Sequence, residues 1–130
     1  MEEHKNTVLV IEDEEALAKI LEDQLLLSGF SVRCEHNGKD GYEAALAMKP
    51  DLILLDLLLP KMNGMTVLRN LRKDPWGKNA RVIVLTNVNI LHEIAGALGK
   101  DEFDYIVKSD HTVEDIITKV KERILSPATP

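Results

Sequence analysis

Asp56 stands where an acidic residue is hardest to explain without a chemical role. It follows Leu52–Leu55, a continuous apolar run of the kind that a strand buried on both faces requires. A carboxylate at the end of such a strand is costly to bury unless it has partners. The next segment contains Pro60 and Gly64, which break the chain into a loop. We therefore expect Asp56 to belong to a site at the end of this strand.

Four other polar residues end or follow expected strands: Glu12, Asp13, Thr86 and Lys108. In a parallel sheet the carboxyl ends of neighbouring strands meet at one edge, so these side chains should converge on Asp56. Three converging carboxylates repel one another and raise one another's pKa values. A divalent cation removes this conflict, and a site made of oxygen ligands selects a hard ion such as Mg²⁺, which keeps waters and phosphate oxygens as its remaining ligands.

The same residues suit phosphoryl chemistry. Asp56 can act as a nucleophile that forms a covalent acyl phosphate. The metal and Lys108 would neutralise charge on the transferring phosphoryl group, and Thr86 offers a hydroxyl donor to its oxygens. The spacing therefore predicts a Mg²⁺-dependent phosphoacceptor site.

Five strands that alternate with five helices must position these residues. The expected strands are Thr7–Ile11, Phe30–Glu35, Leu52–Leu55 ended by Asp56, Arg81–Leu85 ended by Thr86, and Phe103–Lys108. The expected helices run from about Glu14 to Ser28, from a cap at Asn37 to a point before Pro50, from Met65 through Leu71, over Ile90–Leu98, and from a cap at Thr112 through Ile124.

This alternation predicts an α/β fold, a doubly wound five-stranded parallel sheet with helices on both faces. The first, third and fourth strands are apolar throughout, which is typical of central strands, whereas the second alternates and the fifth is mixed, as edge strands do. With right-handed crossovers the simplest strand order is 2-1-3-4-5, the flavodoxin-like order. A crevice then opens at the carboxyl ends of strands 1 and 3.

Composition limits the class of protein. The 130 residues fit one domain, expected over 1–125, with 126–130 (SPATP) as a tail or the start of a linker. A net charge of −6 disfavours nucleic acid as a partner of this domain.

One cysteine, Cys34, excludes an internal disulfide and suggests a reducing compartment. No N-terminal stretch resembles a signal peptide and no apolar stretch approaches roughly 20 residues, so we expect a cytoplasmic protein without a membrane segment.

From about Thr7 to Ile124 the chain resembles the receiver domains of response regulators, the phosphoacceptor half of two-component signalling. The family's acidic pair after strand 1 matches Glu12 and Asp13, and its phosphorylated aspartate matches Asp56. The sequence DLLLPKMNG that begins at Asp56 is close to the family's loop. By this resemblance, Leu58 would give its backbone carbonyl to the metal.

The resemblance also implies a switch. The family's switch hydroxyl matches Thr86, its aromatic switch residue matches Tyr105, and its lysine matches Lys108. A histidine kinase or phosphotransfer protein would phosphorylate Asp56, Thr86 would move toward the phosphate, and Tyr105 would turn into the vacated space. The face made by the fourth helix, fifth strand and fifth helix would change and bind a downstream protein or a second copy, a population shift between two states.

Two residues depart from the family pattern. Asn87 stands where Ala or Gly is usual, and we expect it to narrow access to the site, so that Asn87→Ala alters phosphorylation or dephosphorylation rates; equal rates would contradict this. Ser109 replaces a proline that usually follows the lysine in a cis bond. We expect a trans Lys108–Ser109 bond, because a cis bond without proline costs about 2.5–4 kcal/mol.

The sequence leaves three other functions open. The chain could be a pseudo-receiver, a phosphorylation-independent interaction module, which Asn87 and Ser109 leave possible. A flavodoxin-like cofactor binder shares the fold but would need a phosphate-binding loop rich in Gly, Ser and Thr after the first strand, where this chain is acidic. An aspartate-nucleophile hydrolase would carry a second acid where Leu58 stands.

Overall fold

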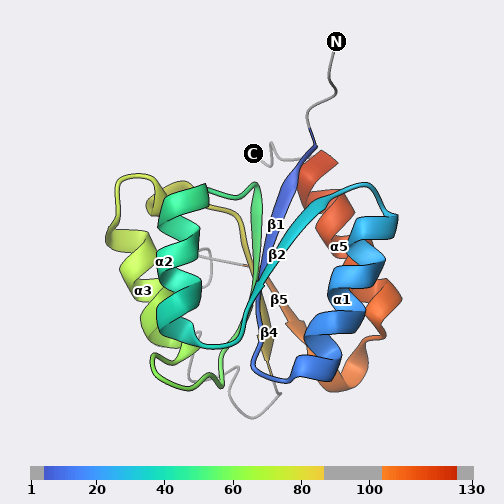
Figure 1. Cartoon of the computed structure of the whole chain (residues 1–130), viewed down its shortest axis with the longest axis horizontal. Helices are drawn as coiled ribbons and strands as arrows, with labels where there is room; N and C mark the ends of the chain where they lie inside the picture. Colours follow the sequence, from blue (N-terminus) through green and yellow to red (C-terminus); the bar gives the residue numbers. More distant parts are fainter. Residues whose placement is uncertain (1–4, 87–103, 126–130) are drawn as a thin grey trace.

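Five parallel strands form one sheet in the structure, a computed structural model that describes residues 5–86 and 104–125 (Figure 1). The strands are β1 (Thr7–Ile11), β2 (Ser31–Glu35), β3 (Leu52–Asp56), β4 (Val82–Thr86) and β5 (Asp104–Val107). Their order is β2-β1-β3-β4-β5, and every neighbouring pair is parallel. The predicted strand order and the predicted edge strands are confirmed.

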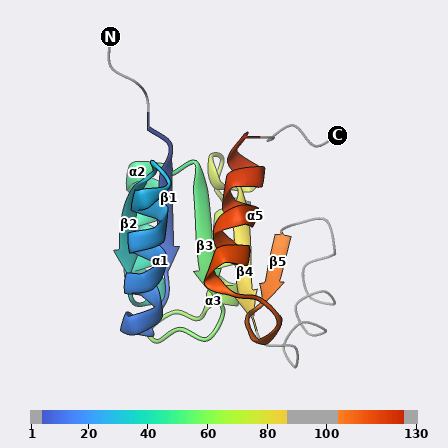
Figure 2. The same cartoon turned by 90° about the vertical axis from the view of Figure 1, so that its right-hand side faces the viewer.

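Helices cover both faces of this sheet. The described α-helices are α1 (Glu15–Leu27), α2 (Gly38–Met48), α3 (Gly64–Lys73) and α5 (Val113–Leu125). Helices α1 and α5 lie on one face, and α2 and α3 lie on the other (Figures 1 and 2). The helix expected over Ile90–Leu98 lies outside the described residues. The fold is therefore the predicted doubly wound α/β architecture.

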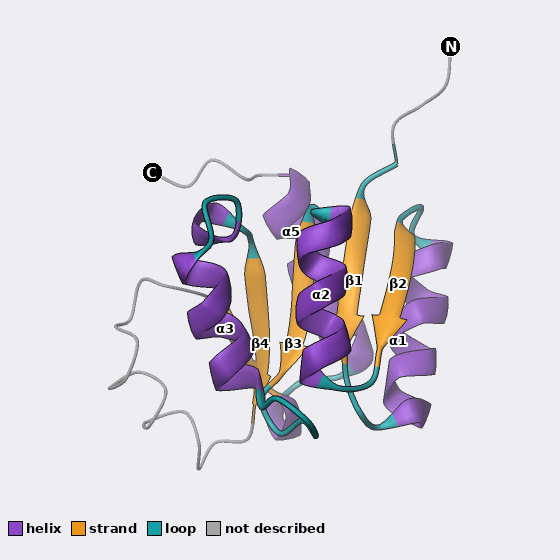
Figure 3. Ribbon diagram, turned by 60° about the vertical axis from the view of Figure 1, so that its left-hand side comes forward, coloured by secondary structure: helices purple, strands orange, loops and turns teal. Residues whose placement is uncertain are grey.

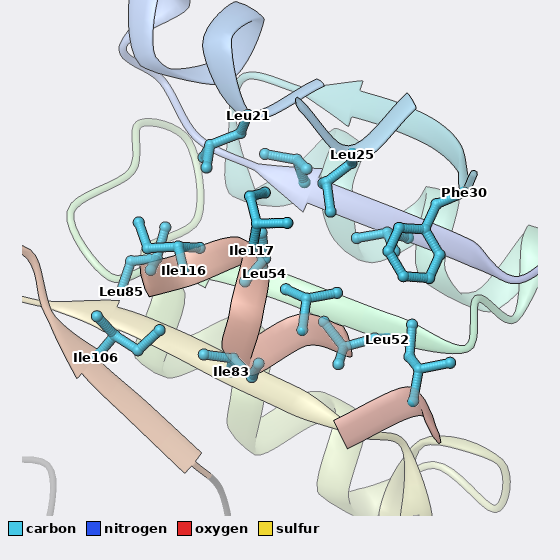
Figure 4. Close-up of a cluster of buried hydrophobic side chains, with 14 residues drawn as sticks. Leu21, Leu25, Phe30, Leu52, Leu54, Ile83, Leu85, Ile106, Ile116 and Ile117 are labelled. Atoms are coloured by element: carbon cyan, nitrogen blue, oxygen red, sulfur yellow. The ribbon is translucent and has the colours of Figure 1, made fainter. Parts of the chain in front are cut away.

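Two apolar clusters hold the layers together. One lies between the sheet and the pair α1 and α5, where Leu54 and Leu85 of the strands meet Leu21 and Ile117 of the helices (Figure 4). The other lies between the sheet and the pair α2 and α3. All five residues of β3 are buried, because both faces of this strand are covered. Asp56, the last of them, is fixed in place by this packing.

Side-chain caps fix the starts of three helices, all at the edge of the sheet where the strands end. Asn37 accepts a hydrogen bond from the Asp40 amide at 2.8 Å at the start of α2. Asn63 does the same for Thr66 at 2.9 Å at the start of α3. At α5, Thr112 and Asp115 form the predicted capping box, with bonds of 2.9 and 3.1 Å. These caps anchor the loops that approach the site.

At the opposite edge of the sheet, Asp51 ties the start of β3 to the start of β1. Its Oδ2 accepts the Thr7 amide at 2.8 Å, and its own amide donates to the Thr7 carbonyl at 2.9 Å. Asp51→Ala should lower the free energy of unfolding by about 1–2 kcal/mol, because it leaves the partly buried Thr7 amide without its acceptor. Urea denaturation would measure this. Asp51→Asn keeps an acceptor and should lose less; equal losses in both variants would contradict the assignment.

Candidate functional site

The candidate site is a cavity of about 270 Å³ at the carboxyl edge of the sheet, the edge marked by the arrowheads in Figure 3. Its lining residues come from the ends of four elements and the loops that follow them: Glu12, Asp13, Glu14, Asp56, Leu57, Leu58, Thr86 and Lys108. The structure thus brings together six of the seven residues that the sequence predicts for the site. The seventh, Tyr105, does not line this cavity.

Three carboxylates form a compact group in the cavity. One oxygen from each of Glu12, Asp13 and Asp56 lies within 4.8 Å of the others. Glu12 is fully buried and Asp56 is buried, whereas Asp13 is exposed. Carboxylate oxygens at this separation suit a hard divalent cation that keeps several water ligands, such as Mg²⁺. The donor set therefore fits the predicted metal.

Lys108 contacts both buried carboxylates. It begins a short 3₁₀ turn (Lys108–Asp110) after β5, and its Nζ lies 3.0 Å from Glu12 Oε1 and 3.3 Å from Asp56 Oδ2. Burial alone would lower the pKa of Lys108, but the hydrogen bond to Glu12 and the two negative charges outweigh it and raise that pKa. Lys108 is therefore a cation held against the two carboxylates.

The backbone of this turn agrees with the sequence-based expectation. No peptide bond within residues 5–86 and 104–125 is cis, so the Lys108–Ser109 bond is trans, as predicted. Asn87 lies outside the described residues, and the expectation for its substitution stays a prediction.

The cavity raises the pKa of Glu12. Burial and the nearby Asp56 carboxylate raise the pKa of Glu12 to about 7, although hydrogen bonds from Lys108 and from the Glu14 amide oppose the shift. The cost of burying two carboxylates side by side is therefore only partly offset by Lys108. A second cation in the cavity would stabilise both in the charged form.

Gly64 lets α3 begin close to Asp56. Its amide donates to the Leu57 carbonyl at 2.9 Å, and a Cβ at this position would lie 2.4 Å from the Asp56 carbonyl oxygen. Any larger residue would force the loop away from the end of β3. The Asp56 carboxylate in turn accepts the Leu58 amide at 3.2 Å, which orients it within the cavity.

The two predicted switch residues lie on neighbouring strands in different environments. Thr86, at the end of β4, is buried and lines the cavity. Tyr105 of β5 is opposite Val84 in the register, two steps before the Thr86–Val107 pair, and 46% of its surface is exposed.

Sequence reasoning missed two neighbours of Glu12. Glu14 lines the cavity, and its amide donates to Glu12 Oε2 at 3.1 Å, a local turn that the two-residue spacing could have indicated. His36 is exposed, but its Nδ1 lies 3.0 Å from the Glu12 carbonyl oxygen. No sequence pattern links these two residues, because the contact depends on the β1–β2 pairing.

The fold and the site together define a doubly wound signalling domain with an acidic, lysine-containing cleft where the order of the strands reverses. Comparison with known proteins agrees: residues 8–121 match the response regulator receiver domain, and the chain belongs to this family. It is thus a receiver domain of phosphorylation-based two-component signalling.

Relatives from two bacteria support this placement. The chain is 33% identical to the transcriptional regulatory protein YkoG of Bacillus subtilis over 125 residues, which cover 96% of this chain and 54% of YkoG. It is 32% identical to the response regulator ArlR of Staphylococcus aureus, with coverages of 88% and 50%. The chain therefore spans about half the length of these two relatives.

A solved receiver domain has the same fold. The receiver domain of the sensor histidine kinase PA1611 from Pseudomonas aeruginosa, solved with a magnesium ion coordinated in its active-site cleft, superposes with a TM-score of 0.81. The two chains are 23% identical, and the comparison covers 95% of this chain and 100% of that one.

Within the part of our chain that the structure describes, no helix is long and apolar enough to cross a membrane.

Proposed function

We propose that this receiver domain accepts a phosphoryl group on Asp56, with Mg²⁺ bound, from a histidine kinase or a phosphotransfer protein. The observation that carries this proposal is the placement of the Asp56 carboxylate in the cavity, with Lys108 Nζ 3.3 Å away and the oxygens of two further acids within 4.8 Å. A nucleophile, a charge-neutralising lysine and a cation site are the parts that phosphoryl transfer to a carboxylate needs.

Glu12, Asp13 and Asp56 would hold the Mg²⁺ through their carboxylates, together with the backbone carbonyl of Leu58. The acid cluster supports this set, and so does the magnesium ion in the cleft of the PA1611 receiver. When bound, the ion supplies positive charge that stabilises the carboxylates and the phosphoryl oxygens. With Lys108 as its cationic partner, the pKa of Glu12 still lies near 7. A further positive charge in the cavity would therefore stabilise the ionised form of Glu12.

The residues of the chain would then act in defined roles. An Asp56 carboxylate oxygen attacks phosphorus, the bond between phosphorus and the donor breaks, and an acyl phosphate forms. Lys108, already paired with Asp56, neutralises charge on the transferred group. Thr86, buried at the rim of the cavity, donates its hydroxyl to a phosphoryl oxygen. The domain catalyses its own phosphorylation and dephosphorylation and no other reaction.

The output would pass through β5 and its neighbours. Movement of Thr86 toward the phosphoryl group would favour the inward position of the half-exposed Tyr105. The surface of the fourth expected helix, β5 and α5 would then bind a downstream protein or a second copy, without contact to nucleic acid or membrane. We place the domain in the cytoplasm at residues 1–125, with 126–130 as a tail or linker; α5 ends at Leu125.

Intact-mass spectrometry tests the proposal. The chain is incubated with Mg²⁺ and a small acyl-phosphate donor, and we expect one added phosphoryl group. The adduct should be absent from Asp56→Asn and absent when the metal is chelated, because each removes one required part of the site.

A histidine kinase or phosphotransfer protein serves as the second donor. Absence of an adduct with every donor would overturn the proposal and favour the pseudo-receiver, an interaction module that does not depend on phosphorylation. A yellow cofactor that copurifies with the chain would instead favour a flavodoxin-like binder.

A further inference from the structure

The loop after β3 is supported from outside by the start of α2. The Gly38 amide, the first of α2, donates to the Pro60 carbonyl at 3.1 Å, and the Met62 amide donates to the same carbonyl at 2.8 Å. Pro60 is two residues from Leu58, which lines the cavity. The position of α2 is therefore transmitted directly to the segment that contributes Leu58 to the site.

Only glycine fits at position 38. A Cβ there would lie 1.6 Å from the Met62 carbonyl oxygen and 2.6 Å from the carbonyl carbon, far inside contact distance, and both are backbone atoms that cannot rotate away. Gly38 is buried, and the Asn37 cap fixes the helix turn that contains it. The helix and the loop thus pack backbone against backbone, and any side chain would separate them.

The loop is held at its other end as well. Gly64 donates to the Leu57 carbonyl at 2.9 Å, and the Leu58 amide donates to the Asp56 carboxylate at 3.2 Å. Between these anchors Lys61 has a φ of 67°, in the left-handed region that residues with a side chain rarely adopt. A strained conformation of this kind persists only where the surroundings hold it in place, and the contact with Gly38 is part of those surroundings.

We propose that Gly38 is a positioning residue for the metal site: it allows α2 to press on the loop and so to fix Leu58 beside Asp56. The inference rests on the proposed function, because Leu58 acts there as a metal ligand through its carbonyl. The inference adds Gly38 to the residues on which the site depends, although Gly38 would touch neither the metal nor the phosphoryl group. Groups that orient metal ligands typically affect affinity by about 10–100-fold.

Titration calorimetry with Mg²⁺ compares the wild type with Gly38→Ala and Gly77→Ala. Gly77 is the control, because a Cβ there would also clash with backbone, at 2.3 Å from the Leu71 carbonyl oxygen compared with 1.6 Å at Gly38, but after the far end of α3. We expect Gly38→Ala to bind Mg²⁺ at least about tenfold more weakly than the wild type. Gly77→Ala should keep wild-type affinity despite its lower stability.

Hydrogen exchange of the metal-free proteins gives a second readout. In Gly38→Ala, the amides of Leu58 and Met62 should exchange faster, while those of β1 keep their protection. If Gly38→Ala does not fold, Asn37→Ala takes its place, since loss of the cap loosens the same turn without a clash; it should weaken Mg²⁺ binding in the same direction, by less.

The outcomes separate the two hypotheses. Equal Mg²⁺ affinity in the wild type and in a folded Gly38 or Asn37 variant would overturn the role of Gly38 and leave the proposed function intact. Equal weakening in Gly38→Ala and Gly77→Ala would overturn it too, because general destabilisation would explain both. A wild type that binds no Mg²⁺ would contradict the metal site itself, and the inference with it.

Discussion

Lys108→Met should destabilise the metal-free protein by about 2 kcal/mol at pH 8. The substitution keeps the length of the side chain but leaves the buried Glu12 and Asp56 carboxylates facing each other without the ammonium group that now lies 3.0 and 3.3 Å from them. Removing one partner of a fully buried ion pair costs about 3–5 kcal/mol. We expect less here, because 26% of the Lys108 side chain is exposed. Urea denaturation at fixed pH measures the loss.

The same variant should bind Mg²⁺ more tightly than the wild type. Lys108 and the cation compete for the same two carboxylates, so removal of the lysine removes a competitor. Added Mg²⁺ should therefore restore much of the lost stability. Lys61→Met is the control, because Lys61 is an exposed lysine of the loop after β3 and its loss changes the net charge equally. Equal effects of the two substitutions would show that net charge, and not the ion pair, is responsible.

The sequence was sufficient to predict the sheet, because its strands differ in their apolar pattern. Leu52–Leu55 has no polar position and became a central strand, whereas Phe30–Glu35 alternates and lies at the edge. Such patterns follow from which faces are buried. Convergence of the polar strand ends on one cavity then follows from parallel pairing alone.

Two aspects of the site were beyond sequence reasoning. The balance of charges depends on distances: Lys108 Nζ lies 3.0 Å from Glu12 and 3.3 Å from Asp56, and the sequence carries no signal for either distance. The role of Gly38 depends on how closely two segments approach, and glycine near a helix start has several ordinary explanations in a sequence. Contacts between elements distant in the chain leave no local pattern.

The stability of the metal-free protein should fall as pH rises from about 4.5 to about 7. The pKa of Glu12 is raised from 4.5 to about 7, so in this window the folded state keeps a proton that the unfolded state has already released. Folding is then opposed by ionisation, and the contribution of Glu12 falls by up to about 3 kcal/mol across the window. Lys108 does not alter this slope, because its pKa is raised and it stays charged throughout. This fall in stability with pH should be absent from the Glu12→Gln variant. Urea denaturation of both proteins across the pH range gives two stability profiles, and their difference separates the contribution of Glu12 from that of the other carboxylates.

Mg²⁺ binding should show the opposite dependence on pH. A proton on Glu12 competes with the cation, so affinity should rise by about tenfold per pH unit below 7 and level off above it, with release of a proton on binding at the lower pH values. Calorimetry in two buffers of different ionisation enthalpy measures that proton. Affinity that is constant from pH 5 to 8, with no proton released, would mean that Glu12 is already ionised before the metal arrives. Lys108 alone would then offset the electrostatic repulsion between the Glu12 and Asp56 carboxylates. A second cation would not be needed to stabilise them in the charged form.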